Sequence, residues 1–180
     1  MTKKIFYWSP YLGRVATIRA VTNSMIGLRK FRKNKFNISI INCYGEWDEQ
    51  LSTLKKKGID IINLQKKIRF NTDTYGYILS RFIYFFTFFL SYKRLKYLLK
   101  KNQPDYLIVH LLTFIPLFLF LNNNFKTKLI LRISGKPKLS LFRNLLWRLS
   151  NKNIHIVFCP TLETKNYLLE KNIFNYKKIK

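Results

Sequence analysis

The sequence predicts an α/β domain built on one doubly wound parallel sheet of six or seven strands, with helices on both faces. The main observation is an alternation of six short apolar segments, each followed by a segment of helical character. The apolar segments are unbroken runs rather than alternating patterns, as strands buried on both faces require. The hydrophobic share is 48% over 180 residues, which is enough for one well-cored domain, and neither a linker nor a repeat interrupts it.

The elements follow one another without long gaps. Strands are expected at residues 4–10, 36–45, 59–64, 105–112, 128–135 and 154–161. Helices are expected at residues 15–33, 47–58, 74–101, 114–124, 139–152 and 162–172. In the first helix, Val15, Ile18 and Val21 recur at helical spacing, and Gly58 ends the second helix after a lysine-rich last turn.

The charge is the most unusual feature of the composition. The chain has 34 Lys and Arg against 8 Asp and Glu, a formal net charge of +26. Such a balance indicates an anionic partner: a nucleic acid, an anionic membrane or phosphorylated ligands. The chain is rich in Lys, Asn and Ile, residues whose codons an AT-rich genome favours. Part of the excess of positive charge is therefore explained by codon bias. No nucleic-acid-binding motif is present, so nucleic acid is the least favoured of the three.

Two apolar segments resemble membrane spans, at residues 82–92 and 106–121. Neither reaches the roughly 20 apolar residues that a spanning helix needs, so we expect core elements, with an interfacial helix over 78–101 as the alternative. The N-terminus lacks a secretory pattern, and Cys43 and Cys159 have no metal-ligand or redox spacing. We therefore expect reduced core cysteines in a cytoplasmic protein that is peripheral on the inner face of the membrane.

Candidate site residues come from the rule that ligands bind outside the carboxyl ends of parallel strands. Gly13 and Arg14 lie between the first strand and the first helix, where a glycine and a helix N-terminus favour a ligand; an ordinary turn is the alternative. His110 ends the fourth strand, where a satisfied core histidine is the alternative. Thr161 is expected to be a helix N-cap without chemistry.

The loop that follows the fifth strand is basic and contains a glycine. It carries Arg132, Ser134, Gly135, Lys136 and Lys138, which face either solvent or an anionic ligand. The 8 acidic residues form no facing pair, which disfavours glycosidase chemistry, and no cluster indicates a metal.

Four segments together carry a family resemblance, at residues 7–28, 104–112, 129–138 and 156–171. They resemble the N-terminal domain of glycosyltransferase family 4. Members of that family are retaining enzymes of the GT-B architecture, in which two Rossmann-like domains face each other across a cleft. The resemblance implies an acceptor-binding domain, a nucleotide-sugar donor gripped by a second domain, and no metal or other cofactor.

The resemblance also implies roles for the candidate residues. The turn at Gly13 and Arg14 corresponds to a glycine-rich turn at the cleft, although only one glycine is kept here. His110 corresponds to a catalytic histidine near the donor sugar ring. The charge of the loop after the fifth strand itself indicates that Arg132, Lys136 and Lys138 face an anionic acceptor such as a lipid-linked pyrophosphate sugar. Ser134 and Gly135 of the same loop are expected to line the cleft.

The family pattern covers only the acceptor-side half of the cleft. We therefore expect a chain that serves glycosyl transfer in cell-surface polysaccharide biosynthesis and is inactive alone. We expect it to be either a truncated or split gene product, or one whose missing half is another polypeptide. The alternative is an acceptor-side or membrane-anchoring subunit of a split enzyme with a separate donor-binding chain. A basic nucleic-acid-binding protein is the least favoured alternative.

Overall fold

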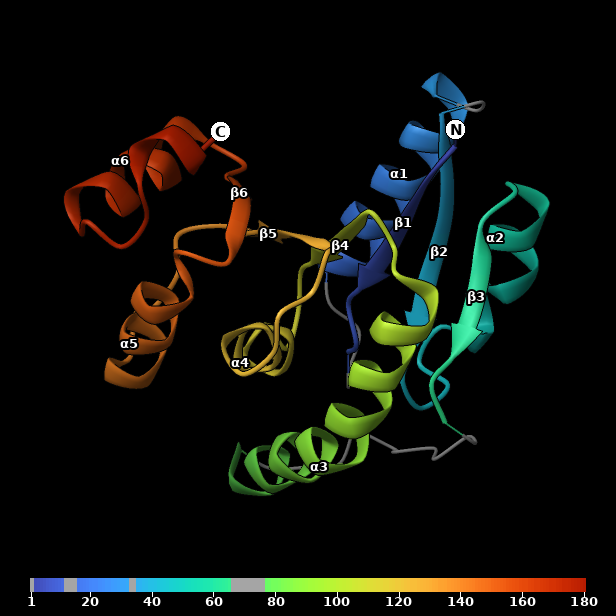
Figure 1. Ribbon diagram of the computed structural model, residues 1–180, viewed down its shortest axis with the longest axis horizontal. Coiled ribbons are helices and arrows are strands. Elements are labelled where there is room, and N and C mark those ends of the chain that lie inside the picture. Colours follow the sequence, from blue (N-terminus) through green and yellow to red (C-terminus); the bar gives the residue numbers. More distant parts are fainter. Residues whose placement is uncertain (1, 12–15, 33–34, 66–76) are drawn as a thin grey trace.

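The computed structural model describes residues 2–11, 16–32, 35–65 and 77–180, and it contains one all-parallel sheet (Figure 1). The six strands lie in the order β3-β2-β1-β4-β5-β6. Their bounds are β1 Lys3–Trp8, β2 Phe36–Asn42, β3 Asp60–Asn63, β4 Tyr106–Val109, β5 Lys128–Arg132 and β6 Ile154–Phe158. The α/β fold with a single parallel sheet, expected from the sequence, is thus confirmed.

Helices alternate with these strands along the chain. They are α1 Ala16–Phe31, α2 Leu51–Lys56, α3 Tyr77–Asn102, α4 Phe114–Leu121, α5 Leu141–Ser150 and α6 Leu162–Glu170, with 3-10 turns η1 Asp48–Gln50 and η3 Tyr176–Lys178. Every predicted segment has a counterpart, but several strands end earlier than predicted. The predicted fourth strand stops at Val109, and three residues later Leu112 has a φ of 44°, which is incompatible with a continuing strand.

The strand order places a switch point between β1 and β4. From β1 the chain builds outward to β2 and β3, and from β4 it builds in the opposite direction to β5 and β6. Trp8 lies opposite Val109 in the parallel pairing, and the next backbone N–H, that of His110, donates to the Trp8 carbonyl at 3.0 Å. Connections that leave such a pair in opposite directions open a crevice at the carboxyl ends of the two strands.

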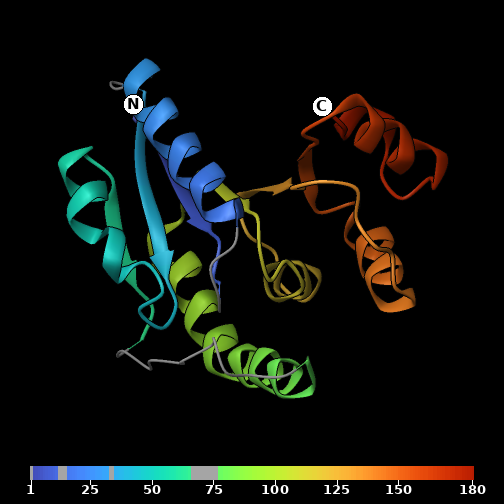
Figure 2. The ribbon, with the colours of Figure 1, turned by 180° about the vertical axis from the view of Figure 1, so that it is seen from behind.

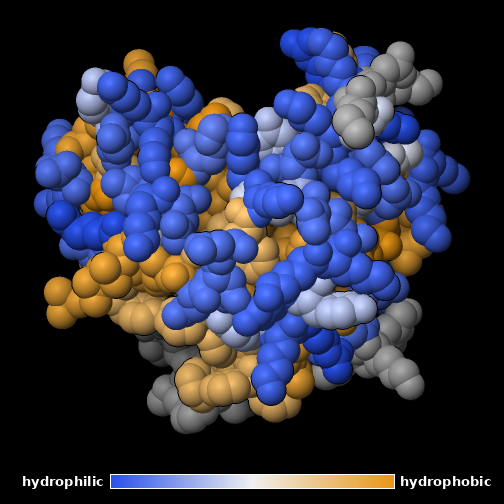
Figure 3. Space-filling model, viewed as in Figure 1, coloured by the Kyte–Doolittle hydropathy of each residue, from blue (hydrophilic) through white to orange (hydrophobic). Residues whose placement is uncertain are grey.

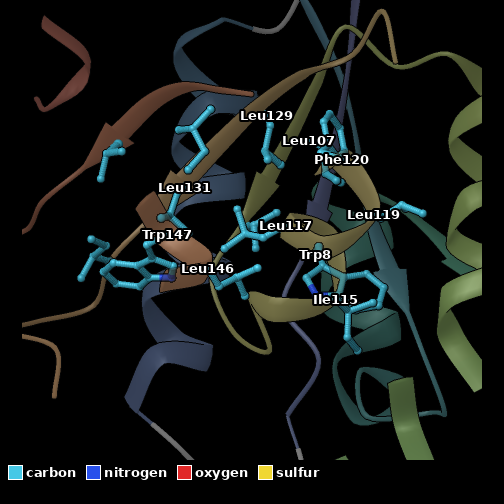
Figure 4. Close-up of a cluster of buried hydrophobic side chains, with 14 of the residues drawn as sticks. Trp8, Leu107, Ile115, Leu117, Leu119, Phe120, Leu129, Leu131, Leu146 and Trp147 are labelled. Atoms are coloured by element: carbon cyan, nitrogen blue, oxygen red, sulfur yellow. The ribbon is translucent and has the colours of Figure 1, made fainter. Parts of the chain in front are cut away.

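Each face of the sheet packs a separate core. On one face, Trp8 and Leu107 pack against α4 and α5, where Leu117 and Trp147 are buried (Figure 4). On the other face, Tyr7 and its neighbours pack against α1 and α2, which Figure 2 shows in front of the sheet. Adjacent strand residues such as Tyr7 and Trp8 therefore belong to different cores, because side chains alternate across a strand.

The edge strand β6 has a further partner near the end of the chain. Ile179 pairs with Val157 in parallel, and the Lys180 N–H donates to the Val157 carbonyl at 2.9 Å. Within the described residues, no helix combines the length and apolarity needed to cross a membrane.

Candidate functional site

His110 is a buried histidine, and its ring atom Nε2 has no hydrogen-bond partner among the described residues. Its side chain is 5% exposed, and the ring stacks on Tyr7 with centroids 6.0 Å apart. Among the described residues, no group hydrogen-bonds to Nε2. Burial, together with the nearby positive charge of Arg132, lowers the pKa of His110 to about 3. The imidazole is therefore neutral at physiological pH, with a free polar atom at the switch point.

Ser9 provides a second unpaired polar group on the neighbouring strand end. It directly follows β1, its side chain is 0% exposed, and Oγ has no hydrogen-bond partner within the described residues. Because β1 and β4 are paired, Ser9 and His110 both lie just past the carboxyl ends of adjacent strands. Buried polar groups are rarely left unpaired, and those that are call for an explanation such as a bound ligand.

Arg132 brings positive charge to this region from the end of β5. Its side chain is half-buried, and its charge also opposes the rise in the pKa of Tyr7 that burial causes. The Tyr7 hydroxyl pairs with Ser24 of α1 at 3.0 Å. The region thus combines a neutral imidazole, two hydroxyl groups and one guanidinium between the ends of β1, β4 and β5.

The first turn of α1 reaches the same region. Thr17 Oγ1 donates to Ser134 Oγ at 3.5 Å, which joins the start of α1 to the loop after β5. Gly13 and Arg14, which the sequence predicts as part of the site, lie outside the described residues. On either side of them, Tyr11 follows β1 and Ala16 begins α1, so the chain passes from strand to helix at this end of the sheet.

Lys136 points to a different partner from the one the sequence suggests. Its Nζ lies 3.5 Å from Glu163 Oε1 and 5.1 Å from the Tyr167 ring centroid, both on α6. Gly135 is unconstrained, because an added Cβ would meet nothing within 4 Å. Of the predicted loop residues, Arg132 thus acts on His110 through its charge and Ser134 contacts the start of α1, whereas Lys136 contacts α6.

The loop after β2 is held by internal hydrogen bonds and contacts Tyr11, which follows β1. The N–H groups of Cys43 and Tyr44 donate to the two carboxylate oxygens of Glu46 at 2.9 and 2.8 Å. Burial nevertheless raises the pKa of Glu46 to about 7. The Tyr11 hydroxyl donates to the Glu46 carbonyl, and the Tyr11 ring packs edge-on against Trp47 with centroids 5.2 Å apart. Tyr11 is thus fixed beside the predicted ligand loop.

Ser9 and Glu46 lie within segments that the strand-end rule marks in the sequence, residues 9–14 and 44–47. Thr17 is the contributor to this region that lies outside the marked segments, and it carries no motif. A hollow of about 590 Å³ is lined by residues of α1 and by Gln50 of η1; they are Ala16, Ile18, Arg19, Thr22 and Gln50. Among the described residues, no group of three or more His, Cys, Asp or Glu side chains is placed to hold a metal.

The sheet order and the polar switch point define a Rossmann-like α/β domain. The solved structures that resemble this chain include UDP-N-acetylglucosamine 2-epimerases and glycosyltransferases. Their likeness identifies the fold more narrowly, as a GT-B-like domain. Neither a family model nor a curated protein matches the sequence. The closer resemblance to glycosyltransferase family 4 therefore rests on the sequence motifs alone.

Three of these structures illustrate the likeness. A protein described as a UDP-N-acetylglucosamine 2-epimerase from Listeria monocytogenes has a TM-score of 0.65 and 12% identity, over 99% of this chain and 44% of its own. The Neisseria meningitidis epimerase bound to UDP-GlcNAc has a TM-score of 0.60 and 16% identity, over 99% and 45%. Glycyrrhiza uralensis UGT73P12, complexed with glycyrrhetinic acid 3-O-monoglucuronide, has a TM-score of 0.64 and 9% identity, over 95% and 47%. The chain thus spans less than half the length of these proteins.

Proposed function

We propose that this chain provides the acceptor-side half of the cleft in an enzyme that transfers a glycosyl group from a nucleotide sugar to a glycan or lipid-linked acceptor. The observation that carries the proposal is that two buried polar atoms at the switch point, Ser9 Oγ and His110 Nε2, have no hydrogen-bond partner among the described residues. Ligands of open α/β sheets bind at this position. The GT-B-like fold supports the choice of a nucleotide sugar as one substrate.

His110 would bind the substrate through a hydrogen bond rather than act as a base that takes up a proton. A histidine whose pKa is about 3 is too weak a base to abstract a hydroxyl proton at neutral pH, but its Nε2 can hydrogen-bond a sugar hydroxyl. In a retaining reaction along the front face, the leaving phosphate can accept the acceptor proton, so that no protein base is required. The imidazole then positions the sugar beside Ser9.

Arg132 would supply the countercharge. It lies close enough to His110 for its charge to lower the histidine pKa, and guanidinium groups bind phosphate oxygens in a bidentate manner. The proposal therefore places a phosphate or pyrophosphate of the substrate near Arg132 and Ser134. Lys136, paired with Glu163, would contribute less.

The two histidines of the chain allow a direct test. We would label the histidine rings with carbon-13 and titrate the chain with UDP-N-acetylglucosamine, using inorganic pyrophosphate as a charge-only probe. The His110 signal should shift with the nucleotide sugar, while the signal of the exposed His155 on β6 stays in place.

Matched arginine variants sharpen that experiment. Arg132→Gln should weaken the UDP-N-acetylglucosamine titration by about tenfold, the loss of one charge-assisted contact, whereas Arg148→Gln on the exposed side of α5 should not. A His110 signal that ignores the nucleotide sugar at millimolar concentration, or that moves equally with pyrophosphate, would contradict the proposal.

The epimerases among the structural neighbours favour a second candidate, in which the same half-site serves epimerisation of a nucleotide sugar. An activity assay on the complete enzyme distinguishes glycosyl transfer from epimerisation. Transfer consumes nucleotide sugar only when an acceptor is added, whereas epimerisation proceeds without one. A separate donor-binding chain and an anionic membrane surface remain proposed partners of the transferase.

A further inference from the structure

We propose that an exposed apolar surface on α5 and α3 enters an anionic lipid bilayer. This surface, called the apolar edge below, consists of Leu141, Phe142, Leu145 and Leu149 of α5, Phe85, Phe86 and Phe89 of α3, and Phe118 of α4. Figure 3 shows hydrophobic residues gathered over α5 and over the N-terminal half of α3. Apolar patches of this extent mark interaction sites rather than ordinary surface.

The α5 part of the edge is not needed for folding. Leu141, Leu145 and Leu149 recur every four residues and therefore form one stripe, with exposed fractions of 91%, 59% and 53%. The opposite side of the helix already faces the core, where Leu146 and Trp147 are buried. The helix is apolar on both sides, and only one side has a partner within the described residues.

The α3 part is built on a packed aromatic layer. Phe85 and Phe89 contact each other at 4.9 Å between ring centroids, and Phe89 contacts Phe88 at 5.5 Å. Phe88 in turn lies 5.7 Å from Phe118 of α4. The exposed rings therefore rest on a connected support, so that a bilayer would meet a preformed surface.

Charge identifies a lipid surface as the occupant. Residues 77–150, which contain all three helices of the apolar edge, include one acidic residue, Asp105, and it binds the Lys4 N–H beside the amino end of the sheet. Arg143 and Arg148 are exposed on α5 itself. A second copy of the chain would bring a net charge of +26 against another of +26, whereas anionic headgroups complement it.

The apolar edge begins near the carboxyl ends of the strands. In a parallel α/β fold, helices run back against the strands, so the N-terminal parts of α3 and α5 lie near these strand ends (Figure 1). His110 directly follows the carboxyl end of β4. A bilayer held there would present a lipid-linked acceptor to the site. This last step rests on the proposed function; the binding of lipid does not.

Vesicle sedimentation tests the surface. The full chain should bind vesicles that contain phosphatidylglycerol more strongly than vesicles of phosphatidylcholine alone. Phe142→Ser combined with Leu145→Ser should weaken that binding by about tenfold or more, because the apolar contacts are lost while the charge is unchanged. Phe31→Ser is the matched control, since Phe31 is 77% exposed at the far end of α1.

A second variant reports insertion without weakening the surface. Leu145→Trp should shift its fluorescence to shorter wavelength on phosphatidylglycerol vesicles; an unshifted spectrum contradicts the inference. Equal vesicle binding by all variants would show that charge alone binds lipid. If light scattering instead detects a dimer of the chain, and Phe142→Ser converts it to a monomer, the apolar edge would be an interface with a second copy. Either result overturns the inference. Failure of the His110 titration with intact vesicle binding would instead refute only the proposed function.

Discussion

At the residue scale, the environment of His110 decides what its chemistry can be. The backbone N–H donates to Trp8, and the ring is held against Tyr7 and away from solvent. Burial and the nearby Arg132 keep the imidazole uncharged. The same sequence position on a solvated strand end would leave a histidine that titrates near neutral pH.

This environment predicts a pH dependence of stability. The pKa of His110 is about 3 in the folded chain and near 6.5 when unfolded, so below pH 6.5 the unfolded state binds a proton that the folded state does not. Stability should fall, by about 1.4 kcal/mol per pH unit, as the pH drops from 6.5 towards 3. The effect should be absent in His110→Gln, as measured by urea unfolding.

The comparison has to be made between wild type and variant, because Glu46 acts in the opposite sense. Its folded pKa of about 7 lies above the usual 4.5, so its contribution is present at low pH and is lost as the pH rises between these values. His155→Gln, at an exposed position, should keep nearly the wild-type profile. An unchanged difference between wild type and His110→Gln from pH 4 to 7 would contradict the buried neutral state.

At the element scale, α5 and α6 begin at side-chain caps. Ser140 Oγ accepts the N–H of Arg143 at the start of α5, and Thr161 Oγ1 accepts the N–H of Thr164 at the start of α6, both at 3.2 Å. The prediction of Thr161 as an N-cap is confirmed. Its position after β6 is thus explained by capping, which leaves Glu163 to pair with Lys136.

Thr161→Ala should destabilise the chain by about 1 kcal/mol, the typical loss on removal of an N-cap hydroxyl. Thermal unfolding followed by circular dichroism measures this loss. Thr161→Ser keeps the hydroxyl and should retain most of the stability. A serine variant as unstable as the alanine variant would show that the methyl group, rather than the cap, is responsible.

At the scale of the whole molecule, the proposed site lies at one end of the sheet, beside the switch point. The carboxyl ends of β1, β4 and β5 and the first turn of α1 meet there, and the apolar edge begins near it. The structural neighbours are about twice as long as this chain, which covers 44% to 47% of the three compared. The site described here is therefore compared with only part of each neighbour.

We expect the 180-residue chain alone to turn over little or no nucleotide sugar, because in the proposed enzyme a second domain makes most of the donor contacts and this chain binds the donor only through its own half of the cleft. Chromatography of UDP-N-acetylglucosamine incubated with the chain measures turnover. His110→Gln is the control for contaminating activity. Robust transfer or epimerisation that depends on His110 would refute the assignment of this chain to half of a cleft.

The sequence by itself determined the elements and their class. Unbroken apolar runs and helical spacing are local properties, which is why the strands, the helices and the all-parallel sheet could be predicted. Capping at Thr161 and the position of His110 after a strand were also readable, because each depends on neighbours within a few residues. Strand ends were less accurate, since they depend on where the ladder loses its partners.

Only the tertiary structure decided which residues meet. The unpaired Ser9 Oγ, the effect of Arg132 on His110, and the pairing of Lys136 with Glu163 join segments far apart in the chain. The apolar edge likewise depends on which side of α5 the core covers. Burial and long-range contact arise from packing, so a local pattern that places a residue on a helix or strand does not contain them.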